Sequence, residues 1–132
     1  MRRWIARKIL YFAGWKIECC KPPHANCVLI AAPHTSNWDF PMMLLFSNAF
    51  GIKIKWMGKD TIFVGPIGYI LKILGGIPIS RGNNSNLVTQ MIELFARSEK
   101  LMLVVPAEGS RSLTKNWKSG FYHIAHGADV PV

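Results

Sequence analysis

The 132 residues suffice for one domain with a hydrophobic core and leave little room for a second. Half of the residues are hydrophobic, which excludes a disordered chain. Sixteen Lys and Arg residues against seven Asp and Glu residues give a net charge of +9, so we expect anionic partners: phosphates, nucleic acid or an anionic lipid surface. Cys19, Cys20 and Cys27 show neither zinc-site spacing nor a CxxC pair, which favours free thiols in a reducing compartment.

The N-terminal segment is strongly basic and carries aromatic residues. Residues 2–14 have a helical pattern, and in the first 21 positions six Lys and Arg residues oppose one Glu. Two interpretations stay open: residues 1–20 lie on an anionic membrane surface, or the helix packs on the domain with its lysines extended into water. No apolar run reaches the roughly 18 residues of a spanning helix, and no cleavage site follows. We therefore expect a peripheral protein at the cytoplasmic face of a membrane.

Apolar runs of strand length alternate with segments of helical periodicity. The predicted strands are residues 27–32, 53–57, 76–80 and 101–105. The predicted helices are residues 2–14, 38–50, 66–74, 87–98 and 120–126. This alternation predicts an α/β fold in one domain over 1–132, with a mixed, partly parallel sheet covered by helices. Residues 129–132 have the pattern of a further strand, so we expect the C-terminal part of the domain to be missing from this chain.

A histidine and an aspartate follow the first predicted strand. His34 comes directly after it, and Asp39 lies five residues later, where a helix begins. A histidine accepts a proton near neutral pH, and a carboxylate in the first turn of the helix can reach back, fix the ring tautomer and stabilise the imidazolium. The alternative is a helix-capping aspartate beside an ordinary loop histidine. A metal pair is not expected, because no third ligand is apparent.

No serine or cysteine has the context of a catalytic nucleophile, so the group that His34 activates would belong to a substrate, such as an alcohol. The amides around Ser36 and Asn37, at a helix N-terminus, are candidate donors to the oxyanion of such a reaction.

Arg81 follows the third predicted strand, beside Gly82. Its guanidinium could hold a phosphate through two parallel hydrogen bonds, or it could be a surface arginine in a turn.

A third polar segment, Glu108-Gly109-Ser110-Arg111, follows the fourth predicted strand. Glu108 and Arg111 could orient a polar substrate, while the amides of Gly109 and Ser110 bind an anion. The alternative is a charged turn held by its own Glu–Arg pair.

Four blocks of residues together resemble the glycerolipid acyltransferase family, which includes the 1-acylglycerol-3-phosphate acyltransferases. In order they read His-x4-Asp, Gly-x-Ile-Pro-Ile-Ser-Arg, Glu-Gly-Ser-Arg-Ser and Val-Pro-Val, and they span His34 to Val132. The resemblance implies transfer of a fatty acyl group from acyl-CoA or acyl-carrier protein to the hydroxyl of a lysophospholipid such as 1-acylglycerol-3-phosphate. It implies no cofactor or metal, and contact with anionic membrane lipids.

The resemblance also implies roles for single residues. His34 would be the general base and Asp39 its orienting partner, with Arg81 on the acceptor's phosphate. The substrate-binding residues of the third block would be Glu108, Gly109, Ser110 and Arg111. Ala107 stands between Pro106 and Glu108, where the family has proline directly before the glutamate. The apolar residues of 40–45 could line an acyl channel or belong to the core.

A different class of function remains possible from the sequence. The early basic residues with Trp4 and Trp15 also fit a non-enzymatic peripheral module that binds anionic lipid or nucleic acid, with His34 incidental. The order of the four blocks argues against this module, and we expect no nucleic acid partner. A hydrolase is a third reading.

Overall fold

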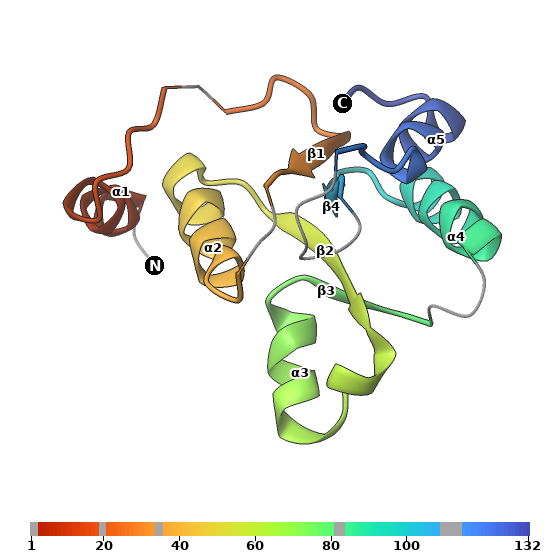
Figure 1. Cartoon of the computed structure of the whole chain (residues 1–132), viewed down its shortest axis with the longest axis horizontal. Helices are drawn as coiled ribbons and strands as arrows, with labels where there is room; N and C mark the ends of the chain where they lie inside the picture. Colours follow the sequence, from red (N-terminus) through yellow and green to blue (C-terminus); the bar gives the residue numbers. More distant parts are fainter. Residues whose placement is uncertain (1–2, 19–20, 34–35, 81–83, 109–114) are drawn as a thin grey trace.

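The computed structural model describes residues 3–18, 21–33, 36–80, 84–108 and 115–132 (Figure 1). It contains a parallel sheet with helices on both faces. The strands are β1 (Cys27–Ala31), β2 (Ile54–Lys59), β3 (Gly76–Ile79) and β4 (Met102–Pro106). The helices are α1 (Arg3–Phe12), α2 (Asp39–Phe50), the 3-10 turn η1 (Asp60–Ile62), α3 (Gly65–Ile73), α4 (Asn84–Arg97) and α5 (Gly120–Ala128).

The strand order is β1-β4-β2-β3, and every pair runs parallel. β4 comes last along the chain but lies inside the sheet, where Val104 pairs with Leu29 of β1 on one side and Trp56 of β2 on the other. Strands covered on both faces are apolar without alternation. The sequence of β4, Met-Leu-Val-Val-Pro, has this character, and its second residue, Leu103, has no exposed surface.

Successive residues of β4 point to opposite faces of the sheet, and each face has its own core. Leu103 and Val105 pack with α4 and α5, through residues such as Phe95 and Ile124. Met102 and Val104 lie in a second core that includes Trp56 and Phe63, against which parts of α2 and α3 pack. Figure 1 shows α4 and α5 together on one side of the sheet and α2, with α1 beyond it, on the other.

α1 packs on α2 rather than on the sheet. Ala6 and Leu10, one turn apart, are fully buried with Ala49 of α2, and Arg7 Nε donates to the Ala49 carbonyl at 3.2 Å. The opposite face exposes aromatic residues such as Trp4 and Phe12. The helix is therefore attached to the protein along one face, while its aromatic face is exposed.

The α/β prediction is confirmed, and each predicted strand and helix is present with shifts at its ends. β2 continues to Lys59, and α4 begins at Asn84, three residues before the predicted start. Residues 129–132 form no strand, but the Val28 amide donates to the Pro131 carbonyl at 2.9 Å, so this segment runs beside β1.

Truncation of a buried valine in β1 tests the core. Val28 has no exposed surface, whereas Val64, before α3, is 72% exposed. We expect Val28→Ala to lower the free energy of unfolding by about 1.5–3 kcal/mol, because it removes buried methyl groups and leaves a cavity. Val64→Ala, the same change at the surface, should stay within about 0.5 kcal/mol of the unsubstituted chain. Equal urea-unfolding curves for both variants would contradict this packing.

Candidate active site

The predicted site segments follow three strands of one parallel sheet. Parallel strands end at the same edge, so the segments after β1, β4 and β3 all leave the sheet there. β1 and β4 are neighbours, with Ala31 paired to Pro106 at their last residues. The His34–Asp39 segment and the segment that begins with Ala107 and Glu108 therefore start side by side.

Asp39 is the first residue of α2, and its carboxylate turns back toward the preceding loop. Its Oδ2 accepts a hydrogen bond from the Ser36 amide at 2.9 Å, and the Ser36 hydroxyl accepts one from the Trp38 amide at 3.1 Å. A carboxylate in this position also meets the partial positive charge of the helix N-terminus. The orientation expected of Asp39 is present, while its expected partner His34 lies in 34–35, outside the described residues.

The hydrogen bond to Asp39 bears on the oxyanion donors. The Ser36 amide is one of the two proposed donors, and it is directed at the Asp39 carboxylate instead of at a substrate. The Ser36 amide is thus better assigned to holding Asp39, which leaves the region of Asn37, at the exposed turn before α2, as the remaining candidate.

Glu108 is buried, with 4% of its surface exposed, directly after the interior strand β4. Ala107 before it is 1% exposed, and its carbonyl accepts the Lys118 amide at 2.8 Å. A buried carboxylate is costly unless it is held by polar partners, so it is seldom found without a structural or functional role. The hydrogen bond between Ala107 and Lys118 brings Lys118, whose side chain is exposed, to this edge of the sheet.

The other predicted binding residues follow β3 and β4 along the chain. Arg81, Gly109, Ser110 and Arg111 fall in 81–83 and 109–114, outside the described residues. β3, which precedes Arg81, is separated from β4 by β2, so the two segments leave the sheet about 10 Å apart, two strand spacings. One bound molecule with a phosphate and a hydroxyl can extend over that distance.

The apolar residues at the start of α2 belong to the core in this structure. Phe40 and Met43 pack against the second core, and the Phe40 ring meets Trp56 edge-on at 4.7 Å. Met42 and Leu45 pack against the α1 contact. Of the two readings of this segment, the contacts favour the core over an acyl channel.

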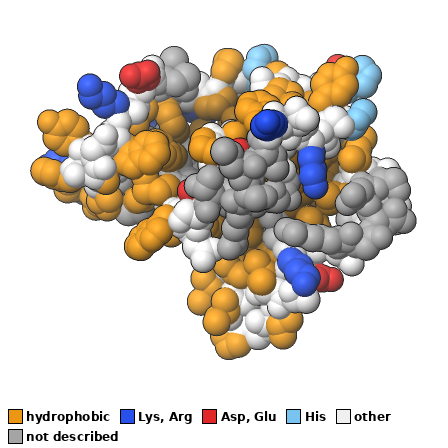
Figure 2. Space-filling model, viewed as in Figure 1, with side chains coloured by type: hydrophobic (Ala, Val, Ile, Leu, Met, Phe, Trp, Pro, Cys, Tyr) orange, Lys and Arg blue, Asp and Glu red, His pale blue; other side chains and the backbone are white. Residues whose placement is uncertain are grey.

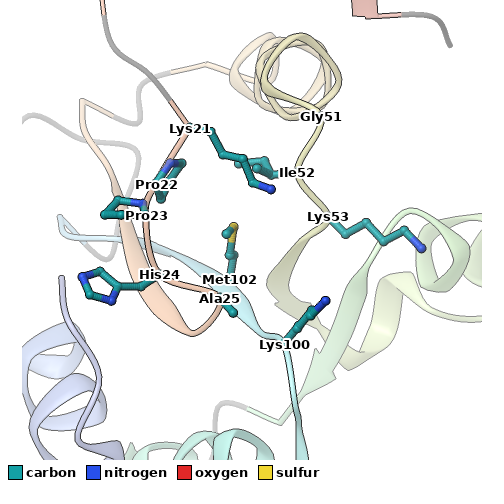
Figure 3. Close-up of a pocket in the computed structure, with 10 residues that line it drawn as sticks. All are labelled: Lys21, Pro22, Pro23, His24, Ala25, Gly51, Ile52, Lys53, Lys100 and Met102. Carbon is teal, nitrogen blue, oxygen red and sulfur yellow. The ribbon is translucent and has the colours of Figure 1, made fainter.

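A hollow of about 610 Å³ lies at the opposite, amino edge of the sheet (Figure 3). Lys21, Lys53 and Lys100, which precede three neighbouring strands, contribute to its lining. In Figure 3, Lys21 extends toward Met102 while Lys53 points away. This hollow includes neither Asp39 nor Glu108. Within the described part of the chain, no group of His, Cys, Asp and Glu side chains is arranged to hold a metal ion.

Comparison with known proteins extends over almost the whole chain. A family model described as acyltransferase matches residues 20–132. The 1-acyl-sn-glycerol-3-phosphate acyltransferase beta of Homo sapiens is 28% identical over 137 residues, which cover 98% of this chain and 49% of that protein. The chain thus spans about half the length of this relative. No solved structure matches this chain significantly.

Cys27, at the start of β1, is buried with a free thiol, and burial raises its pKa. A raised pKa keeps the thiol neutral, so Cys27 should react with iodoacetamide at least about tenfold more slowly in the folded chain than in urea. The folded state favours the protonated thiol. The contribution of the Cys27 thiol to the free energy of unfolding is therefore full below the pKa of the unfolded chain, about 8.5. It is lost as the pH rises toward the higher pKa of the folded chain.

Tandem mass spectrometry, with fragment ions that end between residues 20 and 27, measures this labelling separately from that of Cys19 and Cys20. The Cys27→Ala variant is the matched control, because its stability should fall less between about pH 8 and pH 10. Equal labelling of Cys27 in folded and unfolded chains would show that the thiol is accessible.

Proposed function

Because the chain belongs to the acyltransferase family, as its four sequence blocks predicted, we propose that it transfers a fatty acyl group to a lysophospholipid. The donor is an acyl thioester, acyl-CoA or acyl-carrier protein, and the acceptor is a hydroxyl such as that of 1-acylglycerol-3-phosphate. The observation that carries the proposal is the Asp39 carboxylate, turned back at the start of α2 toward the loop that holds His34. That loop begins beside the buried Glu108.

In the proposed mechanism His34 removes the proton of the acceptor hydroxyl. The oxygen attacks the thioester carbonyl, and the negative charge passes to the carbonyl oxygen, where backbone donors stabilise it. Collapse of this intermediate breaks the carbon–sulfur bond, and the imidazolium returns the proton to the leaving thiolate. Ionised Asp39 stabilises the imidazolium while it exists, and the Ser36 amide keeps the carboxylate in position.

Acceptor binding is assigned to the other segments at the same edge. Arg81 binds the phosphate through its planar guanidinium, and Arg111 supports the same anion. Glu108 and Gly109 position the glycerol end of the acceptor, and the Ser110 amide adds a donor. In this scheme the two arginines set the distance between phosphate and reactive hydroxyl, so a charged headgroup selects the acceptor.

The proposal includes a peripheral position at the cytoplasmic face of a membrane, with α1 as a contact. Trp4, Tyr11, Phe12 and Trp15 are more than half exposed, and the Lys8 ammonium lies 5.1 Å from the centre of the Trp4 ring. Aromatic rings beside basic side chains suit the interface of anionic lipid. None of the helices in the described ranges is both long and apolar enough to cross a bilayer.

Removal of the histidine tests the mechanism. With acyl-CoA and lysophosphatidate as substrates, we expect His34→Ala to lower the release of CoA thiol by about 10²–10⁴-fold, because the acceptor loses its base. Binding to anionic vesicles should persist in the variant. Thiol release that does not need an acceptor would indicate a hydrolase, and equal turnover with and without the histidine would eliminate the mechanism.

A second substitution separates a catalytic carboxylate from a capping one. Asp39→Asn keeps an oxygen for the Ser36 amide but removes the charge, so turnover should fall by about 10²-fold or more while the unfolding midpoint changes little.

Asp60 gives the matched control. It is also the first residue of a helical turn, and its Oδ1 accepts the neighbouring Thr61 amide at 2.8 Å. Asp60→Asn should leave turnover unchanged. Similar small losses for both variants would mean that Asp39 only caps α2.

A further inference from the structure

One face of α3 is apolar and exposed, with no covering element among the described residues. Figure 2 shows hydrophobic side chains over the part of the molecule where Figure 1 places α3. The exposed residues of this face and of the turn before it are between 37% and 72% accessible. They are Ile62, Val64, Ile67, Tyr69, Ile70, Ile73 and Leu74. We refer to these seven residues as the α3 face.

The helix is attached to the protein along a narrow side. Leu71 packs against the second core, and a side chain at buried Gly68 would collide with the backbone of Phe63. At 100° per residue, Ile67, Ile70, Ile73 and Leu74 lie away from Gly68, and with Tyr69 they cover an arc of about 160°. Apolar surface that is continuous over such an arc is typical of a surface that meets another apolar phase.

The charges near this helix are almost all positive. Lys72 is exposed and lies next to Tyr69 around the helix, whereas the exposed Lys55 and Lys59 share the face of β2 that carries Met57, opposite the face that α3 covers. Between residues 53 and 74 the single acidic residue is Asp60. Going around the helix axis, Lys72 is followed by Tyr69 and then by the isoleucines. This order matches a bilayer interface, in which cations lie at the headgroups, aromatic rings at the boundary and aliphatic side chains below it.

We propose that the α3 face enters the interface of an anionic lipid bilayer as a contact separate from α1. A second copy of the chain is a poorer occupant, because it would bring together two proteins that each have a net charge of +9, with Lys72 beside each apolar face. An anionic bilayer supplies both an apolar phase for the isoleucines and negative charge for Lys72.

The contact bears on the proposed acyl transfer, and in this respect it rests on the proposed function. η1 follows β2 directly, so the N-terminal end of α3 lies toward the edge of the sheet where the site segments leave. Insertion of the α3 face brings that edge to the lipid surface, where a lysophospholipid acceptor resides.

The test uses the 132-residue chain and a double variant, Ile67→Ser with Ile70→Ser. Serine has about the helix propensity of isoleucine, so α3 should keep its structure, which circular dichroism and the unfolding midpoint verify. In cosedimentation with vesicles of phosphatidylcholine and phosphatidylserine in equal parts, we expect the variant to bind at least about tenfold more weakly. Tyr122→Ser, at an exposed position on α5, is the control and should bind like the unsubstituted chain.

Two further measurements make the result decisive. Lys72→Gln should weaken binding to the mixed vesicles and not to pure phosphatidylcholine vesicles. Unchanged vesicle binding by a folded double variant would overturn the proposal. If, in addition, the unsubstituted chain is a dimer and the double variant is a monomer, the α3 face is a contact between two copies of the chain instead.

Turnover with a short-chain, monomeric lysophosphatidate distinguishes this result from the proposed function. The double variant should retain that turnover and lose turnover on vesicle-borne acceptor. Absence of turnover in the unsubstituted chain would refute acyl transfer and leave the vesicle-binding result intact.

Discussion

The parallel insertion of β4 between β1 and β2 is the constraint on which the rest of the structure depends. Its backbone hydrogen bonds join β1 to β2, and its side chains contribute to both cores. Because the pairing is parallel, β1 and β4 end side by side. The segments that carry Asp39 and Glu108 therefore begin at neighbouring positions, although the two residues are far apart along the chain. An antiparallel β4 would place Glu108 at the other edge, away from the His34 loop.

Local patterns in the sequence were enough to predict the elements and the class of fold. The apolar runs and the helical periodicity of 87–98 report burial directly, and each became a strand or helix with small shifts at its ends. The strand order was not predictable in the same way, because the local sequence of β4 does not indicate which strands it will pair with. Only the completed sheet shows that the last strand is interior.

The same distinction applies to the candidate site. The position of Asp39 at a helix start, and its turn toward the preceding loop, followed from spacing and from the chemistry of helix N-termini. The burial of Glu108 did not, because a Glu-Gly-Ser-Arg turn is usually exposed, and its burial comes from packing around β4. The hydrogen bond from the Ser36 amide to the Asp39 carboxylate likewise could not be predicted from the sequence, because it depends on the path of the loop before α2. The family of the chain came from four separate blocks whose order, rather than any one block, was distinctive.

The hollow at the amino edge has a consequence for the electrostatics of the whole fold. α2 ends at Phe50 and α4 at Arg97, so both helices direct their last carbonyl groups toward that edge, where Lys53 and Lys100 stand. Positive side chains near helix C-termini offset partial negative charge that the backbone itself creates. At the far edge, α2, α3 and α4 present their amide ends, so part of the attraction for anions there is built from peptide dipoles. Exchange of surface residues cannot remove that part of the field, and it persists for as long as the helices remain folded.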